Sequence, residues 1–483
     1  MKIVIVGGGT AGWMTASTLV KAYPDWDISL YEDSKTPTVG VGESTTQYFR
    51  IWTHFLGLKD EEWMAACNAT YKCSVRFHNF HKKGDVPWQY PFGPPRTDIY
   101  DADYWFYYAK KNGWGRDKFA RDYSYSAACV EQNKLPQDCE YWDTSRYSGF
   151  HFDAVLFAEW LRDNYAMPRG VKHIKRNLKR KPKADLVFDC TGFKSQFNDS
   201  PWKSISDYLP NNSAVVTRIG YQDKENQLRA VTDCTALSSG WVWNVPTYTR
   251  IGTGYNYCDK YISDEEAIVE FRNYLADNVE SDVGAYSDKM FRKIKYRTGR
   301  KKEIWYNNVV SIGLSAGFIE PLESNGLLSV HEFLLNFCRV MADRTHVTQF
   351  MKDTFNNHCN FSFDGFASFV GLHYALTQRN DSPYWRAVSQ IKYPYDNLFK
   401  NAQITFMEES HNLHDKISWK QGDSLWCVMA GHGWNPFNPV IDNTIHMWDS
   451  VPESFKRMEI PPWDDIDSLP TPCEYYKRGM YAN

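Results

Sequence analysis

The chain has 483 residues, of which 43% are hydrophobic and 23% charged, and its formal net charge at pH 7 is -3. This balance excludes the strongly basic surface of a nucleic-acid-binding protein, and no apolar run reaches the roughly 20 residues of a transmembrane helix. The 11 cysteines are scattered without a CxxC pair, which is typical of reduced thiols. We therefore expect a cytoplasmic protein that binds neither nucleic acid nor membrane.

The first 32 residues have the pattern of a βαβ unit. An apolar strand over 2–6 is followed by a glycine-rich turn, a helix over 13–22 and a second strand over 28–31. The turn contains G-x-G-x-x-G, whose glycines let the backbone approach a pyrophosphate at the helix N-terminus. An acid 20 residues further on is placed to hold a ribose hydroxyl. The pattern predicts a dinucleotide site formed by Gly7, Gly9, Thr10, Ala11, Gly12 and Glu32.

The middle of the chain is rich in aromatic residues and lacks one dominant period. Residues 85–150 are predicted to form loops and short helices over a pocket, and His151 to Arg162 a helix. The basic run 172–183 is predicted to be a solvated hairpin or loop, and residues 213–258 a set of antiparallel strands.

Two further buried strands end in glycine turns. The strand over 185–189 leads to Gly192, and the strand over 309–313 leads to Gly317. FAD extends across several strand ends of one domain, so these distant turns favour FAD over NAD. The residues added to the cofactor site are Asp189, Gly192, Gly313 and Gly317.

The run Trp241-Val-Trp243-Asn-Val-Pro246 predicts a strand with both indoles on one face, ended by a proline that cannot continue the ladder. Ordinary core packing and a wall beside a pocket both fit this pattern. The pairs His78/His81 and His411/His414 lack a cysteine or carboxylate partner at the usual spacing, so no metal site is predicted.

Read together, these segments resemble the flavin-dependent halogenases of the tryptophan halogenase type over nearly the whole chain. Val39 to Thr45 (VGVGEST) is similar to the family's G-V-G-E-A-T strap, with Ser44 in place of the common Ala. Tyr71-Lys72 stands where the family has its catalytic lysine. The other matching segments are Gly7–Trp13, Phe150–Ala154, Asp185–Phe193, Gly240–Tyr255 and Pro321–Gly326, the last resembling P-L-E-S-T-G.

The resemblance implies that reduced FAD, O2 and a halide ion generate hypohalous acid, which Lys72 relays to a small electron-rich aromatic substrate, indole or phenol-like. A separate NAD(P)H-dependent flavin reductase would supply the reduced FAD. Catalytic roles fall on Lys72, Glu323 and Ser324, halide binding on Asn325 and Gly326, further cofactor contacts on Gly42, Glu43 and Ser44, and the partition between flavin and substrate on Trp241, Trp243 and Pro246.

The expected fold is α/β: a Rossmann-like FAD-binding domain with an added antiparallel sheet and a mainly helical C-terminal region. Residues 1–340 would form the FAD-binding and halogenation core, with substrate-facing insertions at about 60–150, and 341–483 a helical cover over the substrate. A homo-oligomer is compatible with the sequence.

Two alternatives stay open at this point. A single-component FAD aromatic hydroxylase would oxidise NAD(P)H itself, but no second G-x-G-x-x-G marks a site for that nucleotide. A non-enzymatic flavin-binding protein would have no need of Lys72 or Glu323.

Overall fold

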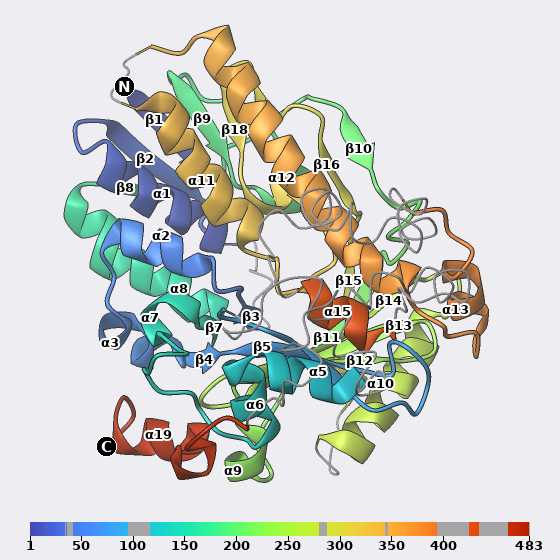
Figure 1. Cartoon of the computed structure of the whole chain (residues 1–483). Helices are drawn as coiled ribbons and strands as arrows, with labels where there is room; N and C mark the ends of the chain where they lie inside the picture. The colour runs from blue at the N-terminus through green and yellow to red at the C-terminus, as the bar shows by residue number, and fades with distance from the viewer. Residues whose placement is uncertain are drawn as a thin grey trace, which may run out of the picture.

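Two large β-sheets form the framework of the computed structural model, which describes residues 1–33, 35, 42–94, 116–279, 287–342, 346–393, 425–433 and 462–482 (Figure 1). One sheet has six strands in the order β17-β18-β9-β1-β2-β8, and the other has seven in the order β15-β11-β14-β13-β12-β5-β6. The predicted α/β fold with an added, mainly antiparallel sheet is confirmed.

The six-stranded sheet is parallel except at β17 (Trp305–Tyr306). Its central strand β1 (Lys2–Val6) lies between β2 (Asp27–Glu32) and β9 (Leu186–Asp189), and β18 (Val309–Ser311) follows β9. Residues 3–6 are buried, as expected for an apolar strand with neighbours on both sides. The carboxyl ends of these parallel strands therefore bring the predicted glycine turns to one edge.

Two local predictions were wrong. Residues 172–175 form β8 (Lys172–Lys175), a parallel edge strand beside β2, because an edge strand tolerates exposed lysines as readily as a loop does. The helix predicted from His151 begins three residues later as α8 (Ala154–Trp160), and His151 belongs to β7 (Gly149–Phe152). Asp153 ends the strand and caps the helix by accepting from the Val155 and Leu156 amides.

The seven-stranded sheet contains the predicted antiparallel strands β11 (Ser213–Ile219), β12 (Val231–Ala236), β13 (Gly240–Pro246) and β14 (Ile251–Tyr257). Its parallel pairing of β12 with β5 (Ser74–His78) was not predicted. A small sheet joins β3 (Glu43–Ser44), β7 and β4 (Thr70–Lys72), and a second joins β10 (Trp202–Ser204), β16 (Gly299–Lys301) and β19 (Gly317–Phe318). The remaining strands are β6 (Trp88–Pro91) and β15 (Arg292–Lys295).

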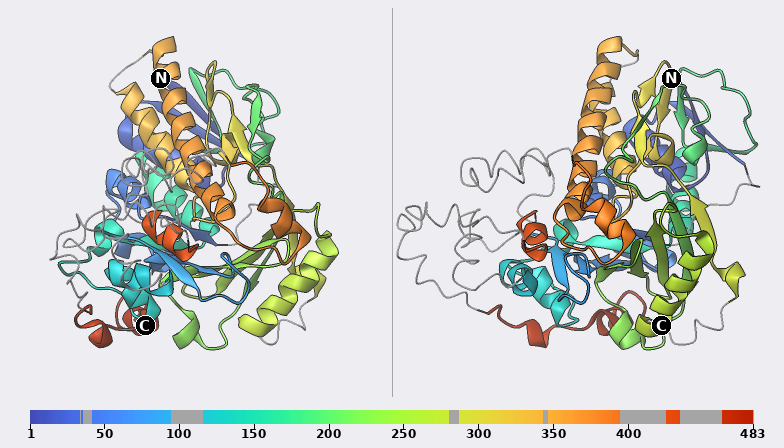
Figure 2. Two further views of the ribbon diagram at one scale, coloured as in Figure 1. Left: turned by 45° about the vertical axis from the view of Figure 1, so that its right-hand side comes forward. Right: turned by 90° about the vertical axis from the view of Figure 1, so that its right-hand side faces the viewer.

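Two long helices connect the region of the six-stranded sheet with that of the seven-stranded sheet. α11 (Leu328–Met341) packs on α1 (Thr10–Ala22) and on α12 (Gln349–Ala375), and α12 continues from the six-stranded sheet toward the other sheet (Figures 1 and 2). The other helices are α2 (Phe49–Leu56), α3 (Asp60–Trp63), α5 (Arg116–Tyr123), α6 (Tyr125–Glu131), α7 (Thr144–Tyr147), α9 (Lys224–Gln227), α10 (Asp264–Asn278), α13 (Pro383–Val388), α15 (Leu425–Gly431) and α19 (Pro472–Arg478). No helix in the described ranges is long and apolar enough to cross a membrane. The division of the chain near residue 340 stays a prediction.

The last helix, α19, returns to the N-terminal half of the chain. The Tyr71 amide donates to the Tyr476 hydroxyl at 2.5 Å. The Tyr481 hydroxyl lies 3.1 and 2.9 Å from the carbonyl oxygens of Met64 and Ala69, which share its single hydrogen. These bonds fasten the C-terminal segment to the start of β4, one residue before Lys72.

Candidate active site

Lys72 lies at the end of β4 with no exposed surface. Its Nζ donates to the Ser324 hydroxyl at 2.5 Å and lies 4.8 Å from the centre of the Phe92 ring. Burial lowers the pKa of Lys72 to about 7, although the nearby charge of Glu323 acts to raise it. A lysine with this pKa is present both as ammonium and as amine near neutral pH.

Glu323 follows β19 on the loop before α11 and is only 1% exposed. Its Oε1 lies 2.6 Å from Nε2 of His373. Its Oε2 is buried and has no hydrogen-bond partner among the described residues. An unpaired buried carboxylate oxygen is costly in a structural position, and it is the arrangement that a proton acceptor needs.

His373 was not identified from the sequence, because a single histidine in a helix carries no motif. Its ring packs against Phe77, with centroids 4.7 Å apart, and against Trp88, to which it is nearly parallel at 5.7 Å with an interplanar angle of 11°. Its Nδ1 lies 3.4 Å from Nε2 of His432. An ionised carboxylate only accepts, so His373 donates from Nε2 to Glu323.

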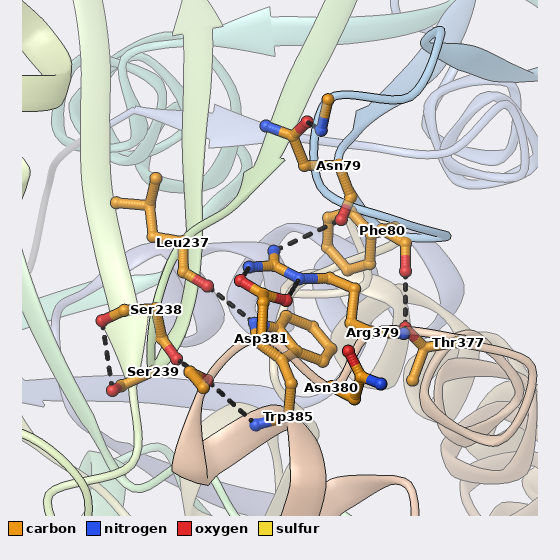
Figure 3. Close-up of polar contacts among 12 residues, drawn as sticks. Asn79, Phe80, Leu237, Ser238, Ser239, Thr377, Arg379, Asn380, Asp381 and Trp385 are labelled. Carbon is orange, nitrogen blue, oxygen red and sulfur yellow. Dashed lines mark hydrogen bonds and ion pairs between the residues drawn. The ribbon is translucent and has the colours of Figure 1, made fainter.

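The end of α12 that carries His373 is fastened to neighbouring loops (Figure 3). Thr377 donates from its hydroxyl to the Phe80 carbonyl at 2.6 Å. Arg379 pairs through two nitrogens with Asp381, at 2.8 and 2.7 Å, and its guanidinium lies 4.5 Å from the centre of the Trp385 ring. The Thr377 bond holds the segment just after α12 against the turn that follows β5, four residues beyond His373.

Ser324 has a left-handed backbone, with φ of 60°, a conformation that is uncommon for serine and concentrates at functional sites. Its hydroxyl oxygen accepts from Lys72 and also from the Ser44 hydroxyl at 3.0 Å. Ser44 lies 2.8 Å from the Thr232 hydroxyl, which lies 2.8 Å from Nε2 of His151. The structure thus joins Ser44, which was predicted to contact the cofactor, to the catalytic loop.

Asn325 and Gly326, the predicted halide residues, follow Ser324 just before α11, whose first turn has no side-chain cap. The Asn325 Oδ1 is buried without a hydrogen-bond partner in the described part of the chain. A Cβ atom added to Gly326 would lie 3.1 Å from Oε2 of Glu43, so the Glu43 carboxyl lies beside this loop. Burial raises the pKa of Glu43 to about 7. A partly open pocket adjoins the loop and is lined in part by Asn325, Gly326 and Phe363.

Trp241 and Trp243 lie side by side on β13, with ring centroids 5.8 Å apart. Trp241 is fully buried, and its indole NH donates to Oε2 of Glu320 at 2.9 Å. The same oxygen accepts from the side chains of Asn211, Asn256 and Tyr374. The strand ends at Pro246, whose carbonyl oxygen accepts a hydrogen bond from the Thr70 hydroxyl at 2.9 Å. Trp241 is thus held in place by its hydrogen bond to Glu320, which fits both core packing and a partition.

The turn after β1 has the shape that a pyrophosphate needs. Gly7 has φ of 118°, and a Cβ atom there would lie 2.3 Å from the Cys190 carbonyl oxygen. A Cβ atom at Gly12 would lie 1.8 Å from the carbonyl oxygen of Gly7. The helix that follows has Gly9 at its N-cap and no side-chain cap, so its first amides can bind an anion. These features fit FAD.

The other predicted cofactor residues differ in their surroundings. Glu32 lies against Gly8 at the end of β2 and its Oε2 is 2.7 Å from Nε2 of His173, while Ala11 lies against Gly313. Asp189 instead accepts from the Thr191 amide and hydroxyl and from the Phe197 amide, so its carboxylate holds its own turn. The remaining positions are as follows: Thr10 donates to the Ala154 carbonyl, Gly192 has φ of 70°, Gly42 has φ of 113°, and Gly317 abuts Phe363.

In the described ranges no group of three or more His, Cys, Asp or Glu side chains is arranged to hold a metal ion. His78 instead lies 2.7 Å from Oδ1 of Asp233 through its Nε2. His411 and His414 lie outside the described residues, as do Val39 to Val41 of the strap.

The dinucleotide turn, buried lysine and buried carboxylate define a flavoprotein with a catalytic centre. A family model described as tryptophan halogenase matches residues 2–443. The chain is 35% identical to tryptophan 6-halogenase SttH of Streptomyces toxytricini, over 98% of this chain and 97% of that protein. It is 28% identical to tryptophan 7-halogenase RebH of Lentzea aerocolonigenes, over 99% and 98% of the two chains. The apo structure of VirX1 superposes with a TM-score of 0.87 at 33% identity, covering 100% of this chain and 99% of that one.

The chain belongs to the tryptophan halogenase family. The prediction of an FAD-dependent enzyme that uses O2 and halide to halogenate an aromatic substrate is confirmed, and the hydroxylase and non-enzymatic alternatives gain no support. Enzymes of this kind depend on a separate flavin reductase and act on a small aromatic substrate.

Proposed function

We propose that this enzyme halogenates an indole or phenol-like ring with hypohalous acid held by Lys72, and that Glu323 takes the ring proton. The observation that carries the proposal is the buried pair itself. Lys72 has no exposed surface, and Glu323 has one unpaired oxygen. Ser324 follows Glu323 in the sequence and accepts a hydrogen bond from Lys72, so it connects the two side chains' positions. The tryptophan 6- and 7-halogenases among the relatives favour an indole.

FAD, when bound in its reduced form at the turn after β1, supplies with O2 the oxidising power that turns halide into hypohalous acid. Lys72 then donates a hydrogen bond to the oxygen of that acid. The ring's electron pair forms the carbon–halogen bond, and the halogen–oxygen bond breaks with its pair on oxygen, which takes up a proton from the Lys72 ammonium and leaves as water. Oε2 of Glu323 accepts the proton from the halogenated carbon, and the C–H pair restores the aromatic ring.

The decisive test supplies reduced FAD through a flavin reductase, with O2, one halide at a time and a panel of indoles and phenols. Mass spectrometry should reveal a halogen isotope pattern on a ring carbon. Incorporation of oxygen without halogen would contradict the proposal, and the panel assigns the substrate class. We further propose that the enzyme works in the cytoplasm beside its reductase, since all 11 cysteines are free thiols. Size-exclusion chromatography with light scattering will test for a homo-oligomer.

The Trp241 indole is proposed to keep the substrate away from the flavin. Replacing Trp241 with alanine is expected to increase hydrogen peroxide and oxygenated products at the expense of halogenated product, because the substrate side then opens toward the flavin. Trp241→Phe keeps most of the bulk and should retain more of the selectivity. Product ratios from mass spectrometry measure the effect, and unchanged ratios in the alanine variant would rule out the partition.

The Glu43 carboxyl is proposed to control halide affinity. With a pKa raised to about 7, it is protonated below that pH and negatively charged above it, beside Gly326. The halide KM should therefore rise as the pH increases from 6 to 8. Glu43→Gln should lower the halide KM at pH 8 about threefold or more, since it removes a nearby like charge.

Lys72 loses its charge over the same pH range, so the glutamine variant should keep a smaller rise in halide KM. A pH dependence identical to that of the wild type would show that Glu43 does not act on the halide.

A further inference from the structure

A chain of buried side chains runs from His151 to Lys72 behind the catalytic loop. It passes through the hydroxyl groups of Thr232, Ser44 and Ser324, with successive distances of 2.8, 2.8, 3.0 and 2.5 Å. The exposed fraction of these five side chains is at most 9%. The members come from four separate segments, β3, β4, β7 and β12, and from the loop before α11.

Each hydroxyl has one hydrogen, and this fixes the direction of the chain. Ser44 gives its hydrogen to Ser324. The bond between Ser44 and Thr232 must then be donated by Thr232. Since Thr232 has no second hydrogen, His151 must donate to it from Nε2.

Both lone pairs of the Ser324 oxygen are consequently occupied, one by Lys72 and one by Ser44. Its own hydrogen must point away from both donors. No described residue accepts that hydrogen in a hydrogen bond of the structure. A buried donor left over in this way costs free energy unless a bound group accepts from it.

We infer that His151, Thr232 and Ser44 are positioning residues that turn the Ser324 hydroxyl outward, so that it donates to the oxygen of the hypohalous acid held by Lys72. The inference rests on the proposed function and names one more donor for the same step. As the halogen–oxygen bond breaks, negative charge grows on that oxygen, and a second pre-oriented donor stabilises it. Ser44 supplies the link that the alanine common at this place in the family's strap would not.

The neutral state of His151 agrees with this role. Burial, with the charge of Lys72, lowers the pKa of His151 well below its usual range. The ring therefore does not take a proton from the chain, and the direction set by the Ser44 bond to Ser324 requires the tautomer with hydrogen on Nε2. Its Nδ1 is buried and has no hydrogen-bond partner among the described residues.

The test uses the holoenzyme with its reductase and compares Thr232→Val with Thr232→Ser. Valine keeps the shape of threonine and removes the hydroxyl, whereas serine keeps the hydroxyl. Thr232→Val and Ser44→Ala should each lower kcat for halogenated product about three- to tenfold, as expected for one hydrogen bond. The KM values for substrate and halide and the trapped yield of hypohalous acid should stay within twofold, and Thr232→Ser should recover most of the kcat.

A double-mutant cycle separates positioning from a merely structural role. In a Ser324→Ala background, Thr232→Val should have no further effect on kcat, since the hydroxyl that it orients is gone. Ser368→Ala is the matched control, because Ser368 is 9% exposed like Ser44 and its hydroxyl donates only to the Asp364 carbonyl within α12. It should keep the wild-type kcat.

An unchanged kcat in Thr232→Val, or the same fold loss with and without Ser324, would overturn the inference while leaving the proposed function intact. A wild-type enzyme that gives no halogenated product in the same assay would overturn both. Ser44→Ala removes a single buried oxygen and provides the second variant if Thr232→Val does not fold.

Discussion

Replacing Lys72 with methionine is expected to abolish halogenated product while the enzyme still binds FAD and consumes O2. Methionine fills similar space, but it cannot donate to hypohalous acid. A loss of about 10³-fold in product formation is in the range for removal of a positioned proton donor. Product by mass spectrometry and oxygen uptake by electrode, measured on the same sample, test this directly.

The same variant has a signature in stability. Because the pKa of Lys72 is about 7 in the folded protein and near 10.4 when unfolded, the unfolded state binds more protons between these values. Wild-type stability should therefore rise with pH through this window, and the destabilisation due to Lys72 is greatest below pH 7. The Tm advantage of Lys72→Met should shrink as the pH approaches 10.

Lys203→Met is the matched control, since Lys203 is a half-exposed lysine paired with Asp364 at 2.9 Å. It should keep the activity of the wild type. Normal halogenation by Lys72→Met would remove Lys72 from the mechanism.

Replacing Glu323 with glutamine is the second change with a large expected effect. The amide oxygen can still accept from His373, so the loop should keep its position, but the side chain can no longer take the ring proton. We expect kcat to fall about 10²- to 10³-fold with little change in substrate KM. Trapped hypohalous acid should stay at the wild-type level.

Loss of the ring proton should then become the slow step. A substrate deuterated at the reacting carbon should show a primary kinetic isotope effect in Glu323→Gln and a smaller one in the wild type. Glu303→Gln, a change just before β17 of the six-stranded sheet, serves as the control and should match the wild type in both measurements. Equal isotope effects in Glu323→Gln and wild type would assign proton removal to another group.

Local patterns were sufficient for the cofactor half of the molecule. The strand over 2–6, its glycine turn and the first helix form one contiguous unit, so apolar periodicity and turn chemistry specify them without distant contacts. The family resemblance supplied Lys72 and Glu323. Their burial and their partners were not predictable, because they depend on how β4, β12 and α12 meet in three dimensions.

His373 and Thr232 illustrate what was missed. Neither lies in a recognised motif, and the partner of each is distant in the sequence. His373 bonds to Glu323, 50 residues away, and Thr232 bonds to Ser44, 188 residues away. The error at 172–183 has a different origin. Four residues at a sheet edge, with lysines at both ends, carry no apolar signal that separates a strand from a loop.

The bond from the Tyr71 amide to the Tyr476 hydroxyl affects when the enzyme can first become active. During synthesis the N-terminal region leaves the ribosome first and begins to fold, but the partner of this strand is made some 400 residues later, at about 5–20 residues per second. The strand that carries Lys72 therefore receives this anchor only after α19 has been made. A chain that stops short of α19 would hold a complete dinucleotide turn but lack the anchor next to Lys72, so synthesis through α19 is a condition for a finished catalytic centre.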